Sequence, residues 1–189
     1  MLCVQSYPKI CLYSYGNFSS PLLLWLLSQK ADADDFTFRI SASAWLEEVS
    51  PEEPSWDVGD TIRLAPILAA HGVDLLDVSA GGIDVRQKIR HGPEYQVPFA
   101  AGVKASQSSG DWKLLVASVG NLGSGPVANA VIESGRTDVV FVGREFLKNP
   151  GLVWKMAEEL GVGVRSAKQI DWTTRGRARV WLGSGKVKA

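Results

Sequence analysis

Glycine and polar residues directly follow three apolar runs of the chain, and residues of these types could hold an anion. The segments are Ser79–Gly82, Gly120-Asn121 and Gly143-Arg144. Glycine lets backbone N–H groups approach a bound molecule closely, and arginine offers a planar fork of donors that matches a phosphate. Gly120 and Gly143 stand at corresponding positions of consecutive segments. Together with Arg144 they are predicted to form a phosphate cradle.

Each of these signals also has a plainer explanation. A glycine after a strand is often needed only for a tight turn. The string 120-GNLGSG-125 has neither the G-x-G-x-x-G spacing nor that of a Walker motif, so it is weak by itself. A phosphate contact and a tight turn therefore both remain open for these glycines.

Arg39 is a stronger signal because it lies inside an apolar run, at 37-TFRIS-41. Charged side chains are almost never fully buried without a partner. The partner could be a bound ligand, or it could be Asp74 or Asp77 in an ion pair across the sheet.

The remaining residue types that often carry chemistry are assigned ordinary roles. His71 precedes a glycine and is expected to cap a helix, and His91 is expected to be solvated in a polar loop. Cys3 and Cys11 have no CxxC or Cys/His context, so we expect reduced thiols in a cytoplasmic protein and no metal site.

The elements that must position these residues alternate along the chain. Apolar runs rich in β-branched residues predict strands at 37–41, 74–79, 114–119 and 138–142. Helical spacing and end signals predict helices at about 57–72, 98–105, 124–134 and 151–160. An apolar helix at about 21–30 is also expected, and it is far shorter than the roughly 20 apolar residues that span a bilayer.

This alternation predicts an α/β fold with a parallel sheet. Ligands of such sheets bind over the carboxyl ends of the strands, where the glycines and polar residues stand. Four βα units form either a small doubly wound sheet or half of a (β/α)₈ barrel. A complete barrel typically needs about 250 residues, more than the 189 of this chain.

The charge balance argues against two classes of partner. Lys and Arg together number 20, as do Asp and Glu, so the formal net charge is zero. A balanced charge does not suggest a nucleic-acid partner or an anionic membrane surface.

Several longer segments, in the right order, resemble the old yellow enzyme family of FMN-dependent NAD(P)H:flavin oxidoreductases, or ene-reductases. The resemblance covers about residues 36–172 and is carried by the segments 39-RISASAW-45, 74-DLLDVSAGG-82, 92-GPEYQVPFA-100, 116-VASVGNL-122 and 138-DVVFVGREFLKNPGLVWKMAEELG-161. It implies a partial TIM barrel made of strands five to eight, with a divergent segment at 1–35 and a tail at 173–189.

The resemblance also implies an FMN site, with NAD(P)H as reductant and an activated alkene as substrate. Arg39 matches the family's strand-five arginine, which contacts the flavin ring near N1 and O2. The strand-six end, Ser79 to Gly82, which includes Gly81, matches a region near the ribityl chain. Gly120 with Asn121, and Gly143 with Arg144, match the loops that hold the FMN phosphate.

The parts of the family that act on substrate are not matched. The family carries a His-x-x-His or His-x-x-Asn pair after strand four, and many members add a tyrosine proton donor. The only histidines here, His71 and His91, stand in no such motif, so no catalytic residue is assigned. We therefore expect an oxidoreductase fragment.

The alternative to an oxidoreductase fragment is an inactive truncated relative. Such a chain would bind FMN or phosphate weakly, or only on assembly with another chain. Four βα units alone would leave two open sheet edges, so a homo-oligomer is one way to close the sheet. A phosphate-binding barrel segment of another enzyme class would not account for 92–100 or 144–150.

Overall fold

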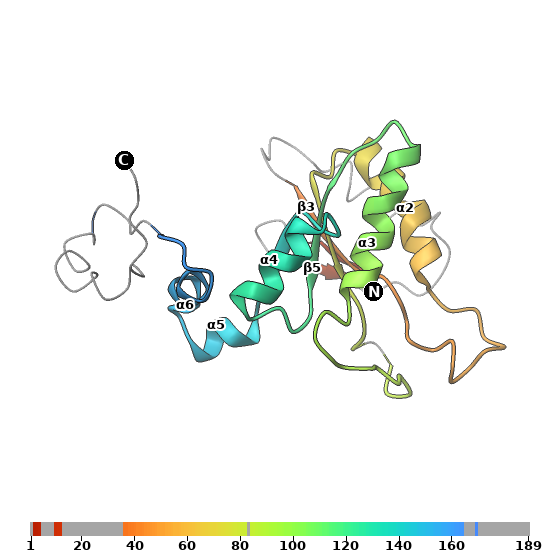
Figure 1. Ribbon diagram of the computed structural model, residues 1–189. Coiled ribbons are helices and arrows are strands. Elements are labelled where there is room, and N and C mark those ends of the chain that lie inside the picture. Colours follow the sequence, from red (N-terminus) through yellow and green to blue (C-terminus); the bar gives the residue numbers. More distant parts are fainter. Residues whose placement is uncertain (1, 5–9, 13–35, 83, 165–168, 170–189) are drawn as a thin grey trace. The chain divides into compact units, whose positions relative to one another are not determined.

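The computed structural model describes residues 2–4, 10–12, 36–82, 84–164 and 169 (Figure 1). These residues fall into two compact units. The first comprises residues up to Asn121 together with Val131–Phe141, and the second comprises Leu122–Ala130 and the residues from Val142 onward.

One six-stranded sheet, in the order β2-β1-β3-β4-β5-β6, forms the centre of the first unit. Its strands are β1 (Leu2–Val4), β2 (Ile10–Leu12), β3 (Thr37–Ser41), β4 (Leu75–Ser79), β5 (Leu115–Val119) and β6 (Val139–Phe141). The strands β3 to β6 pair in parallel. The predicted parallel α/β sheet is therefore confirmed, and its architecture is consistent with part of a TIM barrel.

Helices separate the parallel strands, as the sequence predicts. They are α2 (Val58–Ala70), α3 (Val97–Ser106), the 3₁₀ turn η1 (Gln107–Ser109), α4 (Gly125–Glu133), α5 (Arg144–Lys148) and α6 (Leu152–Glu159). The predicted helices at 57–72, 98–105, 124–134 and 151–160 correspond to α2, α3, α4 and α6. The predicted helix at 21–30 lies outside the described residues.

The core lies between one face of the sheet and the helices α2 and α3, which Figure 1 shows next to each other on one side of the strands. Successive residues of a strand point to opposite faces, so every second side chain of β3, β4 and β5 enters this core. The fully or almost fully buried members include Phe38, Ile40, Leu76, Val78, Val116, Leu64, Leu68, Ala100 and Val103. The alternate residues, including Arg39 and Asp77, therefore occupy the other face.

Sequence signals at both ends of α2 explain where this helix starts and stops. Asp57 accepts a hydrogen bond from the backbone N–H of Asp60, and the Asp60 side chain accepts one from the N–H of Asp57, which completes a capping box. His71 is the C-terminal cap, as predicted, and its Nδ1 lies 2.8 Å from the carbonyl oxygen of Ile67. These caps fix α2 after the long loop that follows β3.

One prediction about the sheet edges is wrong. The edge of β3 was expected to be open, but β1 pairs with it antiparallel, with Leu2 opposite Ile40 and Val4 opposite Phe38. Strand β2 then pairs with β1. Unpaired strand edges favour pairing with any suitable segment, and here the chain's own first residues fill that position. Among the described strands, β2 and β6 are the edges.

Candidate functional site

Arg39 forms an ion pair with Asp77 on the face of the sheet opposite the α2 and α3 core. The two residues are directly opposed in the β3–β4 register, and Nε of Arg39 donates to Oδ2 of Asp77. The Arg39 guanidinium also lies over the ring of Phe141, with 5.9 Å from Cζ to the ring centroid. Of the two partners left open by the sequence, Asp77 is the one that pairs with Arg39.

The two partners of this pair differ in exposure. The Asp77 side chain is 2% exposed, whereas that of Arg39 is 41% exposed. Burial raises the pKa of the Asp77 carboxyl above its ordinary value, although the neighbouring Arg39 guanidinium acts in the opposite direction. The Oδ1 atom of Asp77 is buried and has no hydrogen-bond partner in the described structure. The carboxylate is therefore poorly compensated, while much of the arginine remains accessible.

The ends of β3 and β4 are tied together by two of the predicted site residues. The Ser79 hydroxyl donates to the carbonyl oxygen of Ile40 at 2.9 Å, and the backbone N–H of Gly81 donates to Oγ of Ser41 at 3.2 Å. Gly81 has a φ of +94°, and a Cβ atom there would lie 2.4 Å from Cδ1 of Ile89. The left-handed backbone therefore favours glycine at this position, and a larger residue would also displace the end of the Ile89 side chain.

Gly120 and Asn121 form a turn with left-handed backbone after β5, with φ values of +115° and +56°. A Cβ atom on Gly120 would lie 2.9 Å from Cε1 of Tyr95 and 3.2 Å from Cγ of Gln96. Both the backbone and the space around Gly120 therefore exclude larger residues. This observation supports the tight-turn explanation for Gly120. It does not test a contact with phosphate, which stays a prediction.

Tyr95 and Gln96 connect the turns after β4 and β5. Gln96 is buried, and its Nε2 donates to the carbonyl oxygen of Ala80 at 2.9 Å and to the Tyr95 hydroxyl at 2.8 Å. These two side chains also fill the space beside Gly120. The sequence assigned no role to Gln96, because its partners Ala80 and Gly120 lie far from it along the chain.

Gly143 and Arg144 belong to the second compact unit. Gly143 is the N-cap of α5 with a φ of −103°, and no atom lies within 4 Å of a Cβ built on it. Neither backbone nor space requires glycine there, unlike at Gly120. Arg144 is exposed and begins a helix of five residues. The predicted meeting of Gly120 with Gly143 and Arg144 around one phosphate stays a prediction.

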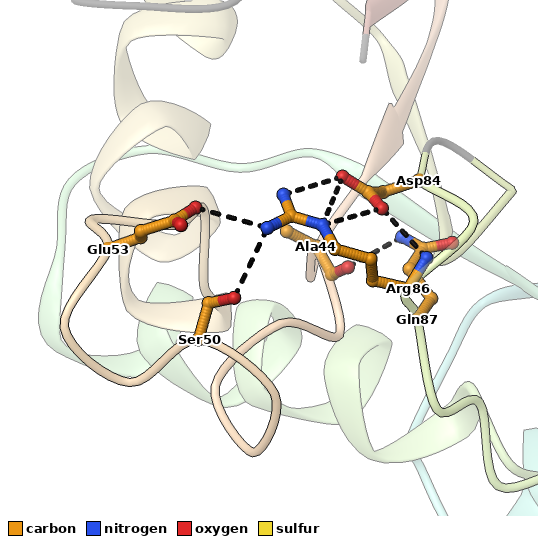
Figure 2. Close-up of polar contacts among 6 residues, drawn as sticks. All are labelled: Ala44, Ser50, Glu53, Asp84, Arg86 and Gln87. Carbon is orange, nitrogen blue, oxygen red and sulfur yellow. Dashed lines mark hydrogen bonds and ion pairs between the residues drawn. The ribbon is translucent and has the colours of Figure 1, made fainter.

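A polar network joins the loops after β3 and β4, which the sequence did not predict (Figure 2). Arg86 donates to both carboxylate oxygens of Asp84, and its Nη1 lies 3.3 Å from Oγ of Ser50 and 3.5 Å from Oε2 of Glu53. The hydrogen bonds from Arg86 hold the pKa of Asp84 below its ordinary value. Nε2 of Gln87 donates to the carbonyl oxygen of Ala44 at 2.5 Å. The two loops therefore form one connected rim.

A cavity of about 280 Å³ lies within this rim. Its walls are apolar on one side, where Trp45 and Phe99 meet edge to face with 5.5 Å between ring centroids. Trp45 has a φ of +52°, which is unusual for a bulky residue. The other lining residues are polar or charged: Ser43, Glu47, Glu48, Lys88 and Arg90.

Neither a metal site nor a membrane-spanning helix occurs among the described residues. They contain no group of three or more His, Cys, Asp or Glu side chains that could hold a metal ion. The helices among them include none that is both long and apolar enough to cross a membrane.

Comparisons with known proteins give one consistent result. Residues 28–162 match the model of the NADH:flavin oxidoreductase / NADH oxidase family. The chain is 48% identical over 147 residues to an NADH:flavin oxidoreductase of Gibberella zeae, which covers 75% of this chain and 35% of that protein. It is 37% identical over 115 residues to an NADPH dehydrogenase of Bacillus pumilus, covering 61% of this chain and 32% of the relative.

A third relative, an NADPH dehydrogenase of a Geobacillus species, is 37% identical over 133 residues. That match covers 70% of this chain and 36% of the relative. The chain thus spans about a third of the length of the curated relatives it matches.

Proposed function

This chain belongs to the NADH:flavin oxidoreductase / NADH oxidase family, and from that membership we propose that it binds FMN as part of an NAD(P)H-dependent oxidoreductase of the ene-reductase type. The proposal assigns Arg39 to the flavin ring, Ser79 and Gly81 to the ribityl side, and the two glycine turns to the phosphate. It also places these residues on strands five to eight of the family's barrel.

The single observation that carries the proposal is the state of Arg39. Its Nε is paired with Asp77, but its side chain is 41% exposed on the face away from the helices. Among the described residues, neither Nη1 nor Nη2 has a hydrogen-bond partner. A guanidinium with free terminal donors fits the pyrimidine edge of a flavin, which presents acceptor atoms.

The phosphate assignment is supported by the two turns in different ways. Gly120 and Asn121 have left-handed backbone, a conformation in which successive N–H groups can converge on an anion. Arg144 is exposed, with no hydrogen bond to any described residue, so its guanidinium is available. Because α5 is so short, we assign the phosphate to side-chain and turn donors and not to a helix dipole.

FMN supplies the hydride chemistry when it is bound, and the protein supplies orientation and charge. Arg39 would stabilise negative charge on the pyrimidine edge of the ring. Gly120, Asn121 and Arg144 would anchor the phosphate tail, which fixes the position of the ring. The carbonyl group of the alkene would need a polarising side chain. The two histidines of this chain have other positions, since His71 caps α2 and His91 is exposed beside Tyr95.

That last observation favours a second candidate function, FMN binding without turnover. In this alternative the chain holds the cofactor through Arg39 and the phosphate residues, weakly or only on assembly with another chain. Both candidates require an FMN site, so binding is the first property to measure.

Titration of the purified 189-residue chain with FMN, followed by flavin fluorescence, tests the binding site. We expect saturable binding. Because a hydrogen bond to a charged group contributes about 1.5–3 kcal/mol, Arg144→Ala should weaken FMN binding about ten- to a hundredfold and leave riboflavin binding nearly unchanged. Lys148→Ala is the matched control, because it removes a positive charge from the same helix at a residue already paired with Glu145.

Two results would count against this site. Absence of saturable FMN binding by the folded chain would refute the proposed function. Equal weakening of FMN and riboflavin binding by Arg144→Ala would show that Arg144 does not hold the phosphate. Oxidation of NADPH with an enone, compared with free FMN at the same concentration, then separates the two candidates. Turnover above free FMN favours the enzyme, and we expect none from this chain alone.

A further inference from the structure

Asp77, the partner of Arg39, is a buried carboxylate whose hydrogen-bonding capacity is only partly met in the described structure. It lies in the middle of β4, between Arg39 of β3 and Ala117 of β5 in the strand register. It is 2% exposed, and only one of its two carboxylate oxygens has a hydrogen-bond partner in the described structure. A buried carboxylate with half of its acceptor capacity unmet is costly for a fold.

The ion pair does not offset that cost well. Desolvation outweighs the attraction of Arg39, so the pKa of Asp77 is raised and not lowered. Buried ion pairs are often no more stabilising than apolar residues of similar volume. Stability therefore does not explain Asp77, whose remaining contact is the one with Arg39.

That effect is geometric as well as electrostatic. Nε of Arg39 is held by Oδ2 of Asp77, and the plane of the guanidinium is limited further by the ring of Phe141. A guanidinium held at Nε has a fixed plane, because it is planar and rigid, and the N–H groups on its far edge then point away from the partner. The pair therefore aims the unoccupied donors of that edge and restricts the rotamers of Arg39.

The negative charge of Asp77 also lowers the electrostatic potential at any group that contacts Arg39. Two opposite charges in contact present a much weaker field to a third group than an isolated cation does. A cation beside the pyrimidine edge stabilises the negative charge that a flavin gains on two-electron reduction. A carboxylate behind that cation reduces this stabilisation.

We propose that Asp77 is a positioning residue of the flavin site, which aims Arg39 at the ring and lowers the reduction potential of bound FMN by partly neutralising the arginine. The inference rests on the proposed function, because it requires FMN beside Arg39. It assigns no direct contact between Asp77 and the cofactor.

The test compares Asp77→Asn with the wild-type chain, using FMN as the probe. Asparagine has the size of aspartate but no charge. Affinity is measured by fluorescence titration, and the two-electron reduction potential is measured by reductive titration against a reference dye. We expect Asp77→Asn to remain folded, to bind FMN, and to shift the potential to a more positive value.

The matched control is Asp84→Asn, which removes the same charge from another carboxylate paired with an arginine, in the loop after β4. It should leave the potential unchanged. The double variant Arg39→Gln/Asp77→Asn shows whether Asp77 acts through Arg39. In the Arg39→Gln background, loss of Asp77 should shift the potential much less than it does in the wild type.

Each other outcome overturns the proposal, and the outcomes are distinguishable. If the wild-type chain does not bind FMN, the proposed function fails and this inference fails with it. If the wild type binds but Asp77→Asn leaves the potential unchanged or makes it more negative, only the inference fails. If neither Asp77→Asn nor the smaller Asp77→Ser folds, Asp77 is a structural residue and the inference is wrong.

Discussion

Three glycines differ in backbone conformation and in the space around them: Gly120 after β5, Gly135 after α4 and Gly143 before α5. Gly120 has a φ of +115° and lacks space for a Cβ atom, Gly135 has a φ of +70° with nothing within 4 Å, and Gly143 has neither constraint. Replacing each of them by alanine therefore separates backbone strain from steric contact.

The expected losses follow from the two effects. For Gly120→Ala, a strained backbone costs about 1–3 kcal/mol and an overpacked contact with Tyr95 about 1–3 kcal/mol. The free energy of unfolding should then fall by about 2–6 kcal/mol, a large share of the roughly 5–15 kcal/mol of a typical domain. Gly135→Ala should lose about 1–2 kcal/mol from backbone strain alone. Gly143→Ala should change stability by less than about 0.5 kcal/mol.

Urea unfolding followed by tryptophan fluorescence measures all three variants of the full chain. Gly120→Ala should also lose less stability when Tyr95 is shortened to serine, because the steric contact is then absent. Equal losses for Gly120→Ala and Gly143→Ala would refute the reasoning, since the two sites differ in both backbone and space. Equal losses for Gly120→Ala and Gly135→Ala would show that the contact with Tyr95 has no effect.

Three further predictions concern the first unit. Thr61→Val should lower the free energy of unfolding by about 1–3 kcal/mol, because buried Thr61 accepts a hydrogen bond from Nε1 of Trp56 at 2.9 Å; urea unfolding measures it. Asp57→Ala should lose about 1 kcal/mol through the helix cap, and Asp57→Asn should lose less; thermal unfolding compares them. Burial raises the pKa of Asp77 in the folded chain above its ordinary value of 3.8. The free energy of unfolding of the wild type, relative to that of Asp77→Asn, should therefore be highest below pH 3.8. It should fall as the pH rises through the folded pKa.

Each of these has a contradicting result. A neutral Thr61→Val would mean that the hydrogen bond to Trp56 contributes no net stability. Similar losses for Asp57→Ala and Asp57→Asn would mean that the carboxylate charge matters more than the cap. A stability difference between the wild type and Asp77→Asn that grows with rising pH would mean that Asp77 is stabilised by ionisation, against the effect of its burial.

Local sequence patterns predicted most of the fold because they act within a few residues. The strand at 37–41 was predicted with the observed bounds, since its apolar residues alternate around Arg39. The start of α2 at about residue 57 and its cap at His71 were also correct, because side-chain capping depends on positions within one turn. The antiparallel pairing of β1 with β3 was missed, as three-residue strands carry almost no periodic signal.

The candidate site was less predictable because its geometry depends on distant contacts. Gly120 and Gly143 look alike in sequence, yet only Gly120 has a positive φ and lies against Tyr95 and Gln96, which come from a distant part of the chain. The contact of Arg86 with Ser50 joins residues 36 positions apart, and no local pattern signals it. The ion pair of Arg39 was foreseen as an alternative, but the choice of partner required the strand register.

The pairing of β1 with β3 has a consequence for any assembly of this chain. In a closed barrel, the free side of β3 would have to pair with another strand, and here the chain's own β1 occupies it. A second segment cannot simply add to this sheet beside β3, because β1 must first detach. Assembly through that edge would therefore be a strand exchange, with a rate limited by release of β1 and independent of partner concentration once partner is in excess.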